Sequence, residues 1–370
     1  MWRKLIAMVA LLVTLVAADA RAPAAQAGGR GQPIFGNFNG DQFLDEAFLG
    51  EVPPTFCSVV VRYGTGPGTF GPPVAYIYLN PGNMGGPLVP CPDIGTAVEL
   101  DPGHPHDELV VAWFAGPPGT IPYNLLVLRG FQPTFGLNAR VALPNFMDDA
   151  DFNGDGRTDI YLVTDQGAGF ETMLSFGDGT LSPGPESWCA GPLTYQLRDF
   201  NHNRAQDVLI SYIQGCADFS NGVVVVLDDG AVRQLQLDPS GEITWSARVV
   251  FANSDKFPDV RTVNLVTGRV DYFINTGNGT FVKAPKAVDD FAVITDSRRT
   301  AIDVLANDYV TDQATITITT PPTQGTAHVT SSQAVIYTPN PHHANNDRFV
   351  YQVNDHGKTS KATVRIRFVS

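Results

Sequence analysis

The residues best suited to chemistry in this sequence lie in one acidic, glycine-containing segment, residues 151–159. Oxygen donors stand at alternate positions of this nonapeptide, and position 7 adds a backbone carbonyl: Asp151, Asn153, Asp155, Arg157 and Asp159. Hard divalent cations take six to eight oxygen ligands at about 2.3–2.6 Å, and the two glycines of the segment permit a tight turn. The spacing therefore predicts a calcium-binding loop.

The same pattern returns along the chain. The copies that keep donors at positions 1, 3, 5 and 9 are residues 37–45, with Asn37, Asn39, Asp41 and Asp45, and residues 199–207, with Asp199, Asn201, Asn203 and Asp207. A copy at 99–107 lacks the donor at position 5, and a fifth copy has Phe251 at position 1 and is expected to be empty. We place an aspartate at position 9 of all five copies, 48 to 62 residues apart. A period of this size is typical of propellers and solenoids.

Each repeat also contains short β-rich segments and a glycine-rich turn. Residues 160–163 follow the acidic loop, and a run such as 223–227 precedes the turn. The expected order is strand, acidic loop, strand, longer loop, strand, glycine-rich turn, strand, which is one four-stranded antiparallel sheet. One such sheet cannot bury both faces, whereas radial stacking of several sheets can.

The acidic nonapeptide and the sequence Phe-Gly-Asp-Gly-Thr-Leu at 176–181 resemble the FG-GAP/VCBS repeat of bacterial secreted proteins, which is similar to the integrin α-subunit β-propeller. The resemblance covers residues 31–285 and implies that the acidic loops bind structural Ca²⁺. Five motifs in about 255 residues predict about five four-stranded blades. Seven blades, the usual number in integrin-like relatives, would average 36 residues and would be too short for four strands and their loops.

Composition and the N-terminus point to export. The net charge of −13 argues against binding a nucleic-acid backbone. Arg3 and Lys4 precede an apolar run at 5–18, and small residues surround Ala27, so residues 1–27 are predicted to be a signal peptide, with cleavage after Ala20 as an alternative. The apolar run is shorter than the roughly 20 residues that span a bilayer. We therefore expect a secreted, periplasmic or cell-surface protein without a membrane span after cleavage.

The four cysteines are expected to form disulfides, because exported proteins reach oxidising compartments in which disulfides form and persist. Four cysteines permit three pairings. In an up-and-down blade, the loops between strands 2 and 3 share one face with the connections between blades. Cys57 and Cys216 are assigned to such loops, and Cys91 and Cys189 to such connections. Because each of those loops belongs to the blade that adjoins one of the connections, the predicted topology pairs Cys57 with Cys91 and Cys189 with Cys216.

The repeat period stops before residue 286, and residues 286–370 show a different pattern. Roughly seven short strands in 85 residues predict an Ig-like β-sandwich. Segments such as 302–308 and 347–355 closely resemble the bacterial Ig-like/cadherin-like repeat of large surface proteins, which implies an extracellular spacer or adhesive domain. In such modules acidic pairs can bind calcium, although turn formation alone favours the same residue types. The candidates are Asp289, Asp290, Asn307, Asp308 and Asp355.

A catalytic constellation is not found, so we do not expect an enzyme. The sequence contains no nucleophile-elbow pattern and no phosphate-cradling glycine loop before a helix. His104 and His106 fit a solvated loop better than a transition-metal site, and the carboxylate pairs 148–149 and 228–229 fit turns.

The predicted fold is an all-β chain, a β-propeller of about five four-stranded blades followed by an Ig-like sandwich. The expected function is that of a calcium-stabilised binding or adhesion protein with a carbohydrate or protein partner. Two alternatives remain: a secreted hydrolase or lyase with its active site in the propeller channel, and a structural component of an envelope assembly.

Overall fold

The structure is a computed structural model. It describes residues 28–29, 31–52, 56–80, 90–104, 106–113, 123–141, 143–164, 169–191, 193–295 and 299–369. The predicted signal peptide, 1–27, lies outside these ranges. The described chain is all-β and contains no helix, as predicted. Accordingly, within these ranges there is no helix with the length and hydropathy needed to cross a membrane.

Five antiparallel sheets follow one another along the chain, and each is built on four strands that pair in sequence order. The first contains β2 (Ile34–Gly36), β3 (Asp45–Val52), β4 (Phe56–Arg62) and β7 (Val74–Leu79), and the small hairpin β5 (Gly64–Gly66) and β6 (Thr69–Phe70) lies between its last two strands. The second contains β8 (Ile94–Val98), β9 (Glu108–Ala112), β10 (Leu125–Arg129) and β11 (Gln132–Leu137), and β1 (Gly28–Gly29) pairs with the free edge of β8.

The remaining three sheets repeat this order. They contain β12 (Phe146–Ala150), β13 (Asp159–Val163), β14 (Phe170–Ser175) and β15 (Leu181–Trp188); β16 (Leu193–Arg198), β17 (Asp207–Tyr212), β18 (Asn221–Val226) and β19 (Val232–Asp238); and β20 (Trp245–Val250), β21 (Asp259–Asn264), β22 (Val270–Asn275) and β23 (Phe281–Lys283). The second strands β9, β13 and β17 are buried at every position. Continuous apolar runs are expected there, because neighbouring sheets cover both faces of these strands.

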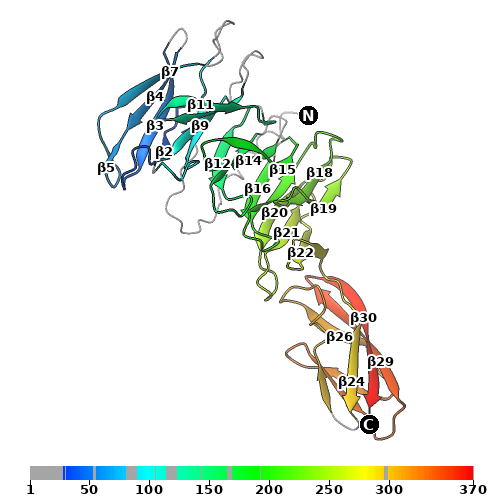
Figure 1. Cartoon of the computed structure of the whole chain (residues 1–370). Coiled ribbons are helices and arrows are strands. Elements are labelled where there is room, and N and C mark those ends of the chain that lie inside the picture. Colours follow the sequence, from blue (N-terminus) through cyan, green and yellow to red (C-terminus); the bar gives the residue numbers. More distant parts are fainter. Residues whose placement is uncertain are drawn as a thin grey trace.

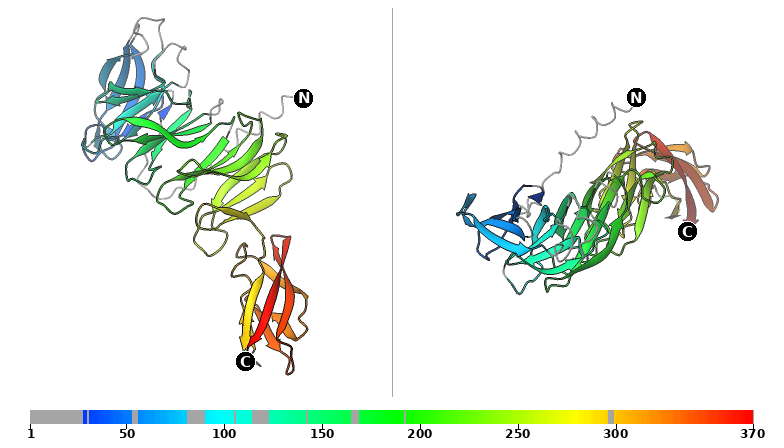
Figure 2. Two further views of the ribbon diagram at one scale, coloured as in Figure 1. Left: turned by 45° about the vertical axis from the view of Figure 1, so that its right-hand side comes forward. Right: turned by 90° about the horizontal axis from the view of Figure 1, so that it is seen from above.

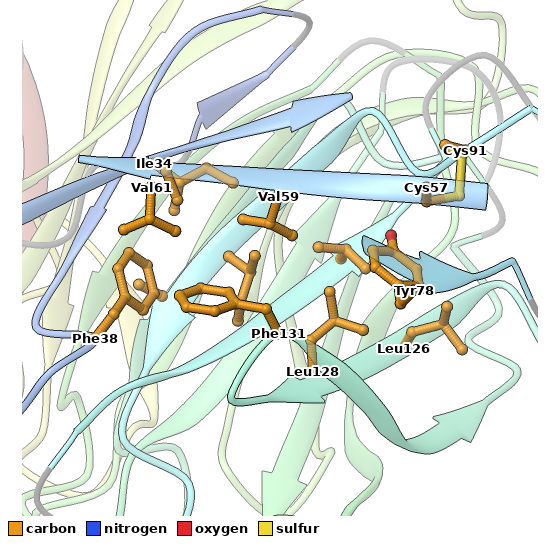
Figure 3. Packing of buried hydrophobic residues seen from close by; sticks show 14 of the residues in the cluster. Ile34, Phe38, Cys57, Val59, Val61, Tyr78, Cys91, Leu126, Leu128 and Phe131 are labelled. Atoms are coloured by element: carbon orange, nitrogen blue, oxygen red, sulfur yellow. A yellow bond between two sulfur atoms is a disulfide. The ribbon is translucent and has the colours of Figure 1, made fainter. Parts of the chain in front are cut away.

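Consecutive sheets pack face to face. Ile34, Val59 and Val61 of the first sheet contact a cluster that includes Leu126 and Leu128 of the second (Figure 3). Three further clusters join the second sheet to the third, the third to the fourth and the fourth to the fifth. No apolar cluster of the described residues joins the fifth sheet to the first. The sheets form a curved, open row (Figures 1 and 2), so the ring closure expected of a β-propeller is not seen.

The composition of the first sheet gives a physical reason for the end of the row. In the later sheets, the residue that follows the acid at the start of the second strand is fully or almost fully buried against the preceding sheet: Leu109, Ile160, Val208 and Val260. In the first sheet this position is Glu46, which forms an ion pair with Arg62. On this outer face of the first sheet, the ion pair occupies the position at which a further sheet would need an apolar side chain to pack against. Repeat arrays commonly end in such a polar outer face.

The C-terminal module is an Ig-like sandwich, as predicted. One sheet has the order β24 (Asp290–Thr295), β30 (Lys358–Val369), β29 (Asn346–Asp355) and β26 (Thr315–Thr320), and the other has the order β25 (Thr300–Ile302), β28 (Val335–Pro339) and β27 (Gly325–Val329). Strand β24 runs parallel to β30. Val304, Tyr337, Phe349 and Tyr351 are fully buried between the two sheets, which gives the module a core of its own.

The module is joined to the fifth sheet through polar contacts around Asp271. Lys358 of the module forms hydrogen bonds with the Asp271 carboxylate and with the Val270 carbonyl. The His356 ring stacks on Tyr272 with a centroid distance of 4.6 Å. Burial alone would raise the pKa of Asp271, but hydrogen bonds from Lys358, Lys283 and Gln236 outweigh burial and lower this pKa to about 2. The carboxylate is therefore charged at neutral pH and links the two parts of the chain.

Candidate metal loops and their aspartate clips

The third acidic loop is closed by its own side chains. The Asp151 carboxylate accepts hydrogen bonds from the Gly154 N–H (2.7 Å) and the Gly156 N–H (3.0 Å). Asn153 Oδ1 accepts from the Asp155 N–H, and Asp155 Oδ1 from the N–H two residues later. Short Asp and Asn side chains favour such local bonds. Gly154 and Gly156 have φ values of 72° and 81°, a left-handed conformation that glycine adopts without steric cost.

Position 9 of this loop acts differently from the other predicted ligands. Asp159 is fully buried, and its Oδ2 accepts from the Phe152 N–H (2.8 Å) while Oδ1 accepts from the Ser175 N–H (2.7 Å). Burial raises the pKa of Asp159 to about 6, although both N–H donors act to lower it. We call this pair of bonds the aspartate clip. It ties position 2 of the loop to the end of the third strand of the same sheet.

The aspartate clip recurs in the first, fourth and fifth sheets. Its members are Asp45 with the N–H groups of Phe38 and Gly64, Asp207 with those of Phe200 and Asp228, and Asp259 with those of Ala252 and Asn275, all at 2.7–2.8 Å. The fifth clip is intact although Phe251 occupies position 1 of its loop. Position 9 therefore stabilises each of these sheets whether or not the loop has the donor set for a metal.

The second loop corrects the predicted repeat register. Glu108 pairs with Val98 across the first two strands, as Asp159 pairs with Ala150 in the third sheet. The Glu108 carboxylate accepts from the Leu100 N–H (2.9 Å), whereas Asp107 accepts from the Asn37 N–H of the first loop (2.7 Å). The assignment of position 9 to Asp107 was therefore wrong by one residue. Glu108, which has a longer side chain than aspartate, takes the place of position 9 and makes one of the two clip bonds, the one to the loop.

The predicted ligands of the first and fourth loops make similar local bonds. Asn37, Asn39 and Asp41 accept from N–H groups of their own loop, and so do Asp199 and Asn203. Asn201 Oδ1 accepts weakly from Asn203 N–H, and its amide donates to Asp228 outside the loop at 2.8 Å. Carboxylate, amide and carbonyl oxygens suit Ca²⁺ chemically. Across the described ranges, however, no three His, Cys, Asp or Glu side chains are gathered as a metal site.

Adjacent loops and turns interlock the row. The Gln206 N–H donates to the Asp151 carbonyl (3.0 Å), which joins the third and fourth loops. Arg129 of the second sheet bonds Asp101, Glu108 and the Asp178 carbonyl of the third sheet. A Cβ atom on Gly179 would lie 2.2 Å from Arg129 Nη2. Glycine at 179, in the Gly-Asp-Gly turn at 177–179, therefore leaves room for the Arg129 side chain. The sequence of the turn gives no sign of this contact.

The disulfides join Cys57 to Cys91 and Cys189 to Cys216, which confirms the predicted pairing. Cys57 lies within strand β4 rather than in the loop before it, a small correction. Each bridge ties a connection between two consecutive sheets to an adjoining sheet: Cys91 precedes β8 and is joined to β4, and Cys189 follows β15 and is joined to the loop between β17 and β18. A loop of this size typically contributes about 2–4 kcal/mol.

Other carboxylates differ in part from their predicted roles. Asp148 and Asp149 lie inside strand β12, so the prediction of a turn was wrong for this pair. Burial first, and then the neighbouring Asp149, raises the pKa of Asp148 to about 7. Asp229 does stabilise a turn, because it accepts from the Ala231 N–H at 2.8 Å. His104 bonds the Asp101 carboxylate at 2.8 Å, and Pro105 lies outside the described residues.

The candidate calcium ligands of the C-terminal module bond to their own module. Asp308 accepts from the Tyr351 hydroxyl, and Asp355 accepts from the N–H and hydroxyl of Thr311. Asp289 accepts from Arg365, and the Asn307 amide donates to the Asp289 carbonyl. Asp290 has one buried oxygen without a hydrogen-bond partner. Most of these groups thus serve as turn and strand contacts within the sandwich.

Glu186 is a buried group that the sequence does not signal. It is fully buried in β15, and neither carboxylate oxygen has a hydrogen-bond partner. Burial, and then the charges of Asp207 and Asp228, raise the pKa of Glu186 to about 10. This glutamic acid is neutral at pH 7, and the local sequence Pro-Gly-Pro-Glu-Ser-Trp contains no motif that would have indicated its position.

The fold and loops define an all-β, disulfide-linked chain that joins a row of repeated sheets to an Ig-like sandwich. The family model for the bacterial Ig domain matches residues 282–367. This range covers the C-terminal sandwich and supports the predicted module. No curated protein matches the chain.

Proposed function

We propose that this protein is an extracellular binding or adhesion protein that presents its sheets and its Ig-like module to a carbohydrate or protein partner. The observation that carries the proposal is the construction of the row. Five similar sheets are joined by interlocking turns and disulfides, and the last is tied to a module that matches the bacterial Ig domain. Such a chain holds a large surface in a fixed arrangement, and preorganised surfaces bind at a lower entropic cost.

The five sheets are proposed to be FG-GAP/VCBS-type blades of the β-propeller kind, here arranged in an open row. Support comes from the four-stranded order of each sheet and from the recurrence of the aspartate clip. Small-angle X-ray scattering on the purified chain is expected to match an elongated arc. A scattering profile of a compact disc would instead indicate a closed ring.

The third loop is proposed to bind structural Ca²⁺ through Asp151, Asn153, Asp155, Asp159 and the Arg157 carbonyl, with the first and fourth loops as further sites. A bound ion would cross-link the loop that connects the first two strands of a sheet. Saturation at 100 times the dissociation constant stabilises a folded state by about 2.7 kcal/mol. We therefore expect Ca²⁺ to raise the melting temperature and EDTA to lower it.

A pair of variants tests the calcium proposal. Asp155→Ala removes a donor from a complete loop, whereas Asp255→Ala changes the same position in the loop with Phe251 at position 1. The melting-temperature gain on adding Ca²⁺ should shrink for Asp155→Ala and stay unchanged for Asp255→Ala. An identical melting temperature with Ca²⁺ and with EDTA in the wild type would refute metal binding.

The location is proposed to be extracellular or at the cell surface. The two disulfides and the bacterial Ig match support it. The binding function is tested with a glycan array and with pull-down from envelope extracts, both in the calcium-loaded state. Specific glycan hits support a carbohydrate-binding protein, and stable co-purification with envelope proteins supports a structural component instead. Turnover of polysaccharides or esters would replace both with an enzyme.

A further inference from the structure

One face of the C-terminal sandwich is basic, whereas the chain as a whole is acidic. The face is the outer surface of the sheet β24-β30-β29-β26, at the end of the molecule remote from the first sheets (Figure 1). In register, Phe291 pairs with Arg365, which also pairs with Arg348, and Val293 pairs with Arg367. We call this surface the arginine face and define it by Phe291, Val293, Arg348, Lys361, Arg365 and Arg367.

Side-chain alternation sets the arginine face apart from the core. Along β30, Val364, Ile366 and Phe368 are buried in the sandwich, whereas Arg365 and Arg367 are exposed. Phe291 and Val293 on the neighbouring strand are 66% and 55% exposed. Large apolar side chains with this exposure are not covered by any described part of the chain, so the face is available to a partner.

The charges on the arginine face are poorly balanced by the protein itself. Asp289 bonds Arg365 at 2.8 Å, but the side chains of Arg348, Arg367 and Lys361 have no acidic partner in the described chain. Arg348 and Arg365 stand directly opposite each other on adjacent strands, and like charges in that position destabilise a sheet. The net charge of the whole chain is −13. A local cluster of cations in this context is complementary to an anionic partner.

The remaining side chains of the face favour a sugar polymer over a protein. Thr315, Thr317, Gln352 and Thr363 occupy outward positions on the neighbouring strands, and such groups hydrogen-bond to hydroxyls. Protein interfaces usually have a dry core enriched in several aromatic residues, whereas this face offers a single aromatic ring, that of Phe291. Guanidinium groups bind carboxylates in a bidentate manner.

We propose that the arginine face binds an extended acidic polysaccharide, with Arg348, Arg365 and Arg367 paired to its carboxylates and Phe291 stacked under a sugar ring. The proposal deepens the proposed binding function and rests on it. It assigns the carbohydrate contact to the C-terminal sandwich, so the row of sheets is not required to contact this ligand.

The test uses the full chain and oligosaccharides of polygalacturonate, with neutral dextran as the uncharged control, in isothermal titration calorimetry. Arg348→Gln/Arg367→Gln should weaken polygalacturonate binding at least tenfold, because charge-assisted hydrogen bonds are among the stronger ones. Phe291→Ala should weaken it about tenfold through loss of stacking. The matched control, Arg248→Gln/Arg299→Gln, removes two exposed arginines elsewhere and should bind as the wild type does. Added salt should weaken binding to the wild type.

Three results of the titrations would overturn the proposal. They are absence of polygalacturonate binding by the wild type, equal affinity of the wild type and the Arg348→Gln/Arg367→Gln variant, and equal binding of polyglutamate or of anionic phospholipid vesicles through the same arginines. The last result would point to an acidic protein or a membrane surface. Glycan-array hits that the variants leave unchanged would refute this inference and leave the proposed function standing. An array without hits would remove the carbohydrate function itself.

Discussion

Replacement of Glu186 by glutamine should stabilise the protein at neutral and alkaline pH. Glu186 is fully buried with both oxygens unpartnered, so its charged form is excluded from the folded state. The folded-state pKa is raised from 4.5 to about 10. At 1.36 kcal/mol per pKa unit, holding this group neutral at pH 8 costs the folded state roughly 5 kcal/mol relative to the unfolded chain.

The sign of the pH dependence follows from proton binding. Between pH 4.5 and 10 the folded state binds the Glu186 proton and the unfolded state releases it, so the free energy of unfolding falls as pH rises. The slope from this single group is about 1.4 kcal/mol per pH unit. Glu186→Gln lacks this slope and should match the wild type near pH 4.5, then exceed its stability increasingly toward pH 8.

Urea unfolding at several pH values, followed by tryptophan fluorescence, measures this difference. The control is Glu242→Gln, which changes an exposed carboxylate and should leave the pH dependence of the wild type intact. Other carboxylates titrate in both proteins and cancel in the comparison. Parallel pH profiles for the wild type and Glu186→Gln would refute the reasoning, because they would place Glu186 in contact with water or with a hydrogen-bond donor.

Three further predictions concern the row and its junction. Asp259→Ala should lower the free energy of unfolding by about 2–4 kcal/mol, because two buried N–H donors lose their acceptor. The control Asp255→Ala should have a small effect. Equal losses of the two variants in chemical denaturation would argue against the clip. The Asp271 pKa is lowered to about 2, so the stabilisation from Asp271 should be complete above pH 3.8 and disappear as pH falls toward 2. Urea unfolding should show a smaller loss between these pH values for Asp271→Asn than for the wild type, and equal losses would contradict the junction contacts. Cys189→Ser/Cys216→Ser should lower the melting temperature by the equivalent of about 2–4 kcal/mol, and calorimetry that finds no change would show that the bridge is not formed in solution.

The repeat could be predicted because its chemistry is local. An Asx-rich nonapeptide folds on its own backbone through bonds between residues two to five apart, and strand order follows from short connections. The number of sheets, the strand order and the cysteine pairing were therefore accessible before the structure. The same local logic placed position 9 of the second loop at Asp107, because spacing alone cannot detect that the loop is one residue longer and that Glu108 starts the strand.

Contacts between residues far apart in the sequence were not accessible in this way. The clip bonds Asp159 to Ser175, and Arg129 bonds the third sheet through the Asp178 carbonyl. These partners are brought together only when sheets form and stack. The burial of Glu186, which lacks any hydrogen-bond partner for its carboxylate, likewise depends on how two sheets meet.

The sequence by itself determined the unit of this protein: a four-stranded sheet with an acidic loop, repeated five times and followed by an Ig-like module. Local turn chemistry and alternation of apolar residues suffice for that. Only the tertiary structure decided that position 9 is a buried clip, that the row is open at Glu46 and Arg62, and that arginines from two strands form one basic face. These features depend on which residues from distant segments are brought into contact, and the period of a repeat does not contain that information.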